Sequence, residues 1–149
     1  MVLALVLVAV LVLWANTSSA EGDAMGVSGK VMAFAKAVSR QEGFPVAGSK
    51  AQRANNPGNL HAGNIGNGTI QDGSTGQITV YGSPSEGWSA LYTFISETMN
   101  GEHGFSADMT LNDYGLRYSG NDPNWAPNVA SMLGVSPLVR MGDLLNDSQ

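Results

Sequence analysis

Residues 53–60 read Arg-Ala-Asn-Asn-Pro-Gly-Asn-Leu, and this stretch begins eleven positions after Glu42. Within it, Asn-Pro-Gly is a turn signal, because proline sets φ, glycine permits a positive φ and asparagine side chains bond to their own backbone. Asn55, Asn56 and Asn59 also carry uncharged amides that both donate and accept hydrogen bonds. Such groups suit a ligand rich in hydroxyls and N-acetyl amides, so all three are candidates for binding a substrate. A tight turn alone explains them equally well.

The residues before this stretch predict an amphipathic helix that ends at Glu42. Its apolar residues follow the i, i+3, i+4, i+7 spacing of one buried stripe, namely Val31, Phe34, Ala35 and Val38. With 100° of rotation per residue, Glu42 falls within roughly 20° of Val31, in the middle of this stripe. We expect the helix to span residues 28 to 41 or 42, with Gly43 supplying the stop signal.

A carboxyl group on an apolar stripe at the end of a helix is a candidate general acid. Desolvation disfavours the ionised form of the carboxyl, and the negative end of the helix dipole acts in the same direction. A glutamate that keeps its proton near neutral pH can donate it to a leaving group. The alternative for Glu42 is a solvated side chain on a frayed last turn, because helix ends are defined only to within one or two residues.

Three blocks of the sequence follow one another in a recognisable order. The first joins Glu-Gly-Phe at residues 42–44 to the stretch at 53–60. The second is Tyr-Gly-Ser-Pro-Ser-Glu-Gly-Trp-Ser-Ala-Leu at 81–91, and the third is Val-Ala-Ser-Met-Leu-Gly-Val-Ser at 129–136. Together they resemble a family of small lysozyme-like proteins from bacteria and their phages, over about residues 30–145. The family often has a third asparagine where this chain has Ala54.

The resemblance implies a lysozyme-like α+β fold, mostly helical and with one small β-hairpin. It also implies an activity on the glycan strands of peptidoglycan, with cleavage of a β-1,4 glycosidic bond by a muramidase, a glucosaminidase or a lytic transglycosylase. The catalytic glutamate of the family ends the first helix, which corresponds to Glu42 in this chain. A catalytically inactive domain of the same fold, which binds peptidoglycan or serves as a structural part of a virion or envelope, is the alternative.

A second catalytic carboxylate would decide the mechanism. Separations of about 5–5.5 Å between the two carboxyl groups imply a retaining hydrolase and about 6.5–9.5 Å an inverting one. Asp72 is the candidate, since it lies on the predicted hairpin that would face the end of the first helix. An Asp-Gly pair is also a standard hairpin turn, which explains Asp72 without any catalysis. Without a second carboxylate, a lytic transglycosylase in which Glu42 acts as both acid and base becomes the better interpretation.

Aromatic side chains form a second group of candidates for contact with sugar rings. The candidates are Tyr81, Tyr114, Tyr118 and Trp125. Tyr114 and Tyr118 are four residues apart and share one face of a predicted helix. Packing in the core remains the alternative for each of the four, while Trp88 and Tyr92 lie on the apolar stripe of another helix and are predicted to be core residues.

Local signals place the remaining elements. A weak hairpin is predicted from residues 69–71 and 77–81, after a loop at 43–68 that would line a cleft. Ser-Pro-Ser-Glu at 83–86 is a capping box that opens a long helix ending at residue 99. Shorter helices are predicted from 110 to 118, from Pro127 to 133 with Met132 inward, and from 136 to 145, the last carrying Leu138.

The first twenty residues differ in composition from the rest of the chain. Residues 2–14 form an uninterrupted apolar run, and Ser18 and Ala20 are small residues at the −3 and −1 positions of a secretory cleavage site. We therefore predict a signal peptide at 1–20, with a short membrane anchor as the alternative, and a single domain at 21–149. The expected location is the periplasm, the cell envelope or the extracellular space.

Composition excludes several classes of partner. The net charge of −5 argues against nucleic acid, whose binding depends on clustered Lys and Arg. With no cysteine and only His61 and His103, a zinc site is not expected, and no cofactor is predicted. The expected partner is the peptidoglycan glycan strand, contact with a membrane is expected only through the N-terminal segment, and the protein is predicted to be a monomer.

Overall fold

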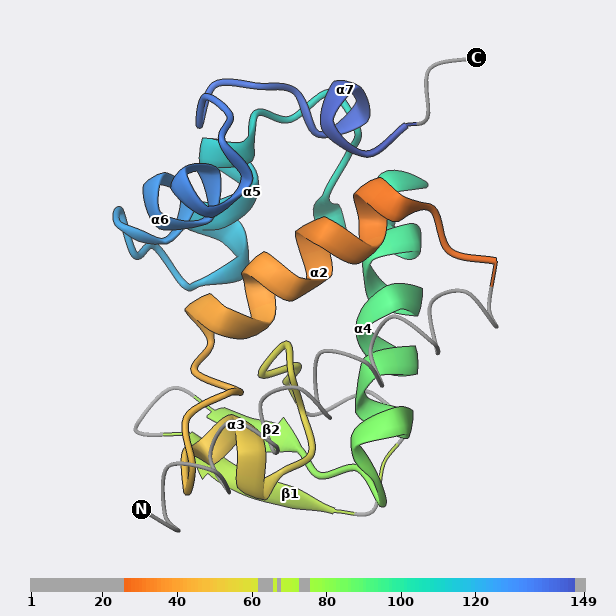
Figure 1. The fold of residues 1–149 in the computed structure, drawn as a ribbon, viewed down its shortest axis with the longest axis vertical. Helices are drawn as coiled ribbons and strands as arrows, with labels where there is room; N and C mark the ends of the chain where they lie inside the picture. Colours follow the sequence, from red (N-terminus) through yellow and green to blue (C-terminus); the bar gives the residue numbers. More distant parts are fainter. Residues whose placement is uncertain (1–25, 62–65, 67, 73–75, 147–149) are drawn as a thin grey trace, which may run out of the picture.

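The computed structural model describes residues 26–61, 66, 68–72 and 76–146, with only the backbone described for Gln71 and Asp72 (Figure 1). These residues form a mostly helical α+β fold with one small antiparallel sheet, which confirms the predicted fold class. In chain order the elements are α2 (Gly29–Gln41), α3 (Lys50–Arg53), β1 (Thr69–Asp72), β2 (Gly76–Thr79), α4 (Pro84–Met99), η1 (Glu102–Gly104), α5 (Leu111–Tyr118), α6 (Trp125–Leu133) and α7 (Met141–Leu145).

Helix α2 has the ends that the sequence predicts. The Ser28 hydroxyl accepts a hydrogen bond from the backbone N–H of Val31, so it satisfies one of the free donors at the start of the helix. At the other end Glu42 is the C-cap, and its N–H donates to the carbonyl of Val38 at 2.9 Å. Gly43 follows with φ +78°, a conformation that glycine adopts without strain. The backbone therefore leaves α2 immediately after Glu42.

Helix α4 confirms the predicted capping box. The Ser83 hydroxyl accepts from the N–H of Glu86 at 3.2 Å, and the Glu86 carboxylate accepts from the N–H of Gly82 at 2.9 Å. The predicted inner face is buried, with Trp88, Leu91, Tyr92 and Ile95 each at most 5% exposed. These side chains join those of α2 and α6 in one hydrophobic core.

The predicted hairpin is present as β1 and β2, which pair antiparallel from Thr69 opposite Thr79 to Asp72 opposite Gly76. The second strand ends at Thr79 rather than at the predicted residue 81. The reason is that the N–H of Tyr81 donates to the carbonyl of Ala54 instead of continuing the ladder. The predicted turn at 72–76 is too long, because Asp72 and Gly76 pair as the last residues of the ladder; residues 73–75 lie outside the described residues.

Helix α3 interrupts the segment predicted as one long loop from 43 to 68. The Ser49 hydroxyl accepts from the N–H of Gln52 and caps this single turn. The prediction was wrong here because a four-residue helix is too short to show a 3.6-residue hydrophobic period.

The C-terminal third departs from prediction in two places. Helix α5 is capped by Thr110 as predicted, but α6 begins at Trp125, two residues before Pro127, and Met132 is 44% exposed. No helix begins at Ser136, because the carbonyls of Pro137 and Val139 accept hydrogen bonds from the first residues of α5. The N–H of Val139 donates to the carbonyl of Ser136 at 3.1 Å, so this segment forms a single turn rather than a helix. Only α7 forms, and Leu138 is 71% exposed.

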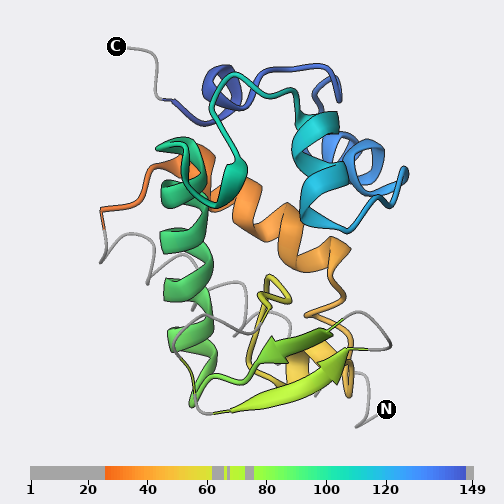
Figure 2. The same ribbon diagram turned by 180° about the vertical axis from the view of Figure 1, so that it is seen from behind.

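The arrangement of the elements sets the place of the site. Figures 1 and 2 show the sheet and α3 at one end of the molecule and α5, α6 and α7 at the other, with α2 between them and α4 alongside. The C-terminal end of α2 therefore lies where the two ends of the molecule meet. Among the described residues, none of the helices combines the length and the apolarity that a membrane crossing requires.

Candidate active site

A cavity of about 510 Å³ lies at the C-terminal end of α2. Its walls come from three segments that are far apart in sequence. These are Gln41 and Glu42 at the end of α2, the loop residues Gly58, Asn59 and His61, and the stretch from the end of α5 to the start of α6, with residues 117–120, Asp122 and Trp125. A cavity of this size is within the range of sites that bind small ligands or a few units of a polymer.

The carboxylate of Glu42 is held from two sides in this cavity. Its Oε1 accepts a hydrogen bond from the indole Nε1 of Trp125 at 2.7 Å, and its Oε2 accepts one from Nδ2 of Asn59 at 2.8 Å. Both donors are N–H groups, and hydrogen bonds to a charged acceptor are stronger than those between neutral groups. The pair therefore fixes the orientation of the Glu42 side chain and stabilises its charged form.

The predicted turn in residues 53–60 places the side chain of Asn59 against Glu42. Asn59 has φ +47°, a left-handed conformation that asparagine tolerates better than most residues, and its N–H donates to the carbonyl of Asn56. Its Nδ2 also approaches the backbone carbonyl of Glu42 at 3.3 Å. The other amide atom, Oδ1, is buried and has no hydrogen-bond partner among the residues that the structure describes. The side-chain amide of Asn59 therefore acts as a hydrogen-bond donor to the end of α2.

Tyr118 forms a wall of the cavity on the side of α5. Its hydroxyl donates to the carbonyl of Gly58, and its ring lies 5.1 Å from that of Trp125 between centroids. Burial raises the pKa of Tyr118 well above its ordinary value of 10.0, and the negative charge of Glu42 raises it further. The phenol therefore remains neutral and acts as a donor that ties α5 to the loop.

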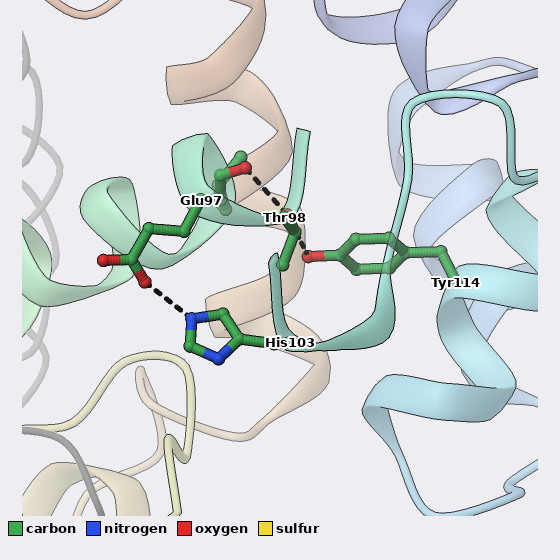
Figure 3. A network of polar contacts seen from close by, with 5 residues as sticks. Glu97, Thr98, His103 and Tyr114 are labelled. Carbon is green, nitrogen blue, oxygen red and sulfur yellow. Dashed lines mark hydrogen bonds and ion pairs between the residues drawn. The ribbon is translucent and has the colours of Figure 1, made fainter. Parts of the chain in front are cut away.

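The other two predicted tyrosines lie elsewhere. Tyr114 is completely buried in the core, where its hydroxyl is 3.4 Å from Oγ1 of Thr98 (Figure 3). Tyr81 is 4% exposed and does not line the cavity. Burial raises the pKa of both phenols. Neither ring presents a face to the cavity, so of the three tyrosines only Tyr118 is placed there.

Asn55 and Asn56 hold the loop in place rather than line the cavity. Asn56 is completely buried, and its Nδ2 donates to the carbonyls of Leu60 and Thr79, while its Oδ1 accepts from the N–H of Leu60. Asn55 donates from Nδ2 to the carbonyl of Tyr81. These bonds occupy the amide groups within the protein, so of the three asparagines only Asn59 faces the cavity.

The predicted second carboxylate, Asp72, stays a prediction. Asp72 ends β1 opposite Gly76, and its side chain lies outside what the structure describes. The cavity instead contains Asp122, whose Oδ1 accepts from the N–H of Asn124 at 2.9 Å. Sequence analysis missed Asp122 because an Asp-Pro pair before a helix has the appearance of an ordinary turn.

A further cluster of titratable groups lies outside the cavity. The ligand atoms of Glu97, Glu102 and His103 all lie within 4.8 Å of one another, and Nε2 of His103 is 2.7 Å from the Glu97 carboxylate (Figure 3). Glu102 and His103 are exposed, and the Glu97–His103 ion pair accounts for the approach of two of the three groups. We therefore assign no metal site to this cluster.

The structure brings Glu42, Asn59 and Tyr118 together with Trp125 in one cavity, and it places Asn55, Asn56, Tyr81 and Tyr114 outside it. Comparisons of the chain with protein-family models, with curated proteins and with solved structures gave no match. The geometry of this cavity and the sequence blocks described above therefore carry the functional argument.

Proposed function

We propose that this protein cleaves β-1,4 glycosidic bonds in the glycan strands of peptidoglycan, with Glu42 as the general acid. The observation that carries the proposal is the place of Glu42, a half-buried carboxylate in the wall of a cavity of about 510 Å³, fixed by two hydrogen bonds. A carboxyl group held in one orientation beside a ligand-sized space is the arrangement that proton transfer to a glycosidic oxygen requires. The resemblance of three sequence blocks to small lysozyme-like proteins supports the same chemistry.

In the proposed reaction Glu42 gives its proton to the bridging oxygen as the bond from that oxygen to the anomeric carbon breaks. In a lytic transglycosylase, the 6-hydroxyl of the same sugar then bonds to the anomeric carbon and returns its proton to Glu42. In a hydrolase, water takes this place, and a second carboxylate assists. Asp122 in the cavity and Asp72 on β1 are the candidates for that second group.

A second candidate function is binding of glycan strands without cleavage. The observation that favours it is that both carboxylate oxygens of Glu42 already accept hydrogen bonds from protein groups. Glu42 thereby joins Asn59 of the loop to Trp125 of α6, which gives the carboxylate a structural role that needs no chemistry. This alternative differs from the enzyme in the wild type, which binds glycan strands but releases no fragments.

The deciding experiment incubates the purified chain with isolated peptidoglycan and identifies soluble fragments by mass spectrometry. We expect fragments from the wild type and a loss of rate of about 10²-fold or more for Glu42→Gln. Glu102→Gln, which changes an exposed carboxylate outside the cavity, is the matched control and should remain active. Fragments with 1,6-anhydro ends identify a transglycosylase, and reducing ends identify a hydrolase.

Two outcomes would contradict the enzyme. A fully active Glu42→Gln variant would remove Glu42 from the mechanism. Sedimentation of the chain with peptidoglycan, without fragments from the wild type, would support the binding function. The segment at 1–20, on which the prediction of export depends, lies outside the described residues. Export to the periplasm, envelope or medium is therefore proposed from the sequence alone.

A further inference from the structure

The indole of Trp125 is locked in place beside Glu42. Trp125 is 2% exposed, and its ring packs against those of Tyr118 and Tyr114, with centroid distances of 5.1 and 6.3 Å. Gly115 on α5 allows this approach, because a Cβ at that position would lie 2.7 Å from Cε3 of the indole. The Nε1–H of Trp125 therefore has a fixed direction, and it points at Oε1 of Glu42 at 2.7 Å.

An indole N–H can donate a hydrogen bond but cannot accept one. Its contact with Glu42 is consequently stronger when the carboxyl is ionised than when it carries a proton. Asn59 donates to the other oxygen and to the backbone carbonyl of Glu42, so it is tied to the end of α2 itself. Trp125 is thus the donor that couples Glu42 to α6, on the far side of the cavity.

We propose that Trp125 is a positioning residue that orients the Glu42 carboxyl and sets the pH at which Glu42 loses its proton. The proposal rests on the proposed function, in which Glu42 must be protonated before the bond breaks. Other titratable groups that line the same cavity are His61 from the loop, Arg117 and Tyr118 from α5, and Asp122 from the segment before α6. The substitution Trp125→Phe changes none of these groups, because it removes the N–H donor and keeps an aromatic ring in the core.

The first test needs no activity. In the ¹⁵N-labelled full chain, the Nε1–H signal of Trp125 is identified as the tryptophan indole signal that Trp125→Phe removes. We expect its chemical shift to follow a single titration with pH, and this titration to vanish in Glu42→Gln. A signal that does not move with pH, or that moves equally in Glu42→Gln, overturns the proposal.

The second test uses the pH dependence of glycan cleavage. For a general acid, activity falls with rising pH as the proton is lost, and this high-pH limb belongs to Glu42. Trp125→Phe should move the midpoint of this limb upward by about one pH unit, since it removes one hydrogen bond to a charged group. Trp88→Phe removes another buried indole, which packs on Phe44 and Tyr92, and should leave the midpoint unchanged.

The two tests separate the possible failures. A lower rate for Trp125→Phe with an unchanged midpoint would show a purely structural role and would overturn the proposal. If Trp125→Phe does not fold, the signal titration of the wild type, compared with that of Glu42→Gln, still decides, because Trp14→Phe and Trp88→Phe identify the other two indole signals of the chain. A chain that cleaves no glycan contradicts the proposed function, whereas the signal titration still reports whether Trp125 senses the charge of Glu42.

Discussion

The side-chain amide of Asn56 donates a hydrogen bond to the carbonyl of Thr79 at 2.9 Å, and so joins the turn at 53–60 to strand β2 across 23 positions of sequence. The same amide donates to the carbonyl of Leu60 and accepts from its N–H, so one buried side chain satisfies three backbone groups. This relationship explains how a loop rich in Asn, Pro and Gly keeps one shape and holds Asn59 against Glu42.

Asn56→Ala should lower the free energy of unfolding by about 2–4 kcal/mol, because buried backbone groups lose their partners and a cavity remains. Urea unfolding followed by circular dichroism measures the change. Asn128→Ala on the exposed face of α6 is the control and should change stability by less than about 0.5 kcal/mol. An equal effect of the two substitutions would show that the hydrogen bonds of Asn56 contribute little.

Gly115→Ala should destabilise the fold by about 1–3 kcal/mol, because the added methyl group would lie 2.7 Å from Cε3 of Trp125 and 2.8 Å from Cβ of Ala126. The change forces α5 and α6 apart and moves the indole away from Glu42. Gly29→Ala is the matched control, since a Cβ there meets no atom within 4 Å. The melting temperatures of the two variants should move in opposite directions, or only that of Gly115→Ala should fall.

Glu42→Gln should lower the free energy of unfolding by about 1–3 kcal/mol, independently of any effect on catalysis. A glutamine amide has one oxygen, whereas Trp125 and Asn59 both donate N–H groups to Glu42. Whichever way the amide turns, one donor faces an NH₂ group and loses its partner. Thermal unfolding of the variant checks this, and an unchanged stability would mean that the two donors find other acceptors.

Stability should fall as the pH rises above about 10, because burial raises the pKa of Tyr114 above its ordinary value of 10.0. Below that pH, Tyr114 is neutral in both the folded and the unfolded chain, so it does not make the free energy of unfolding depend on pH. Above it, the unfolded chain loses the phenol proton while the folded chain keeps it, so the unfolded state is favoured. Tyr118, whose pKa is raised by burial and by the charge of Glu42, adds to the same effect.

Urea unfolding of the wild type and of Tyr114→Phe at several pH values from about 8 to about 11 measures this dependence. The variant loses only the weak contact with Thr98 at 3.4 Å, so its stability near neutral pH should change by about 1 kcal/mol or less. Its decline in stability above pH 10 should be shallower than that of the wild type. Identical slopes would show that Tyr114 does not cause the decline.

The sequence by itself determined where α2, α4 and α5 begin and where α2 ends. Ser28, Ser83 and Thr110 each cap the helix that the sequence predicts, and Glu42 lies at the C-cap with Gly43 after it. These signals act within about four residues, because a capping side chain bonds to backbone groups of its own first turn. Local bonding of this kind can be recognised without knowledge of the rest of the fold.

Only the tertiary structure decided which of the candidate residues meet. Tyr114 and Tyr118 share a helix face, yet one is completely buried in the core and the other lines the cavity. Nothing near Trp125 in the sequence indicates that its N–H bonds to Glu42, 83 positions away. Such contacts depend on how α2, α5 and α6 pack together, and that packing is set by the whole core at once, so no local pattern records it.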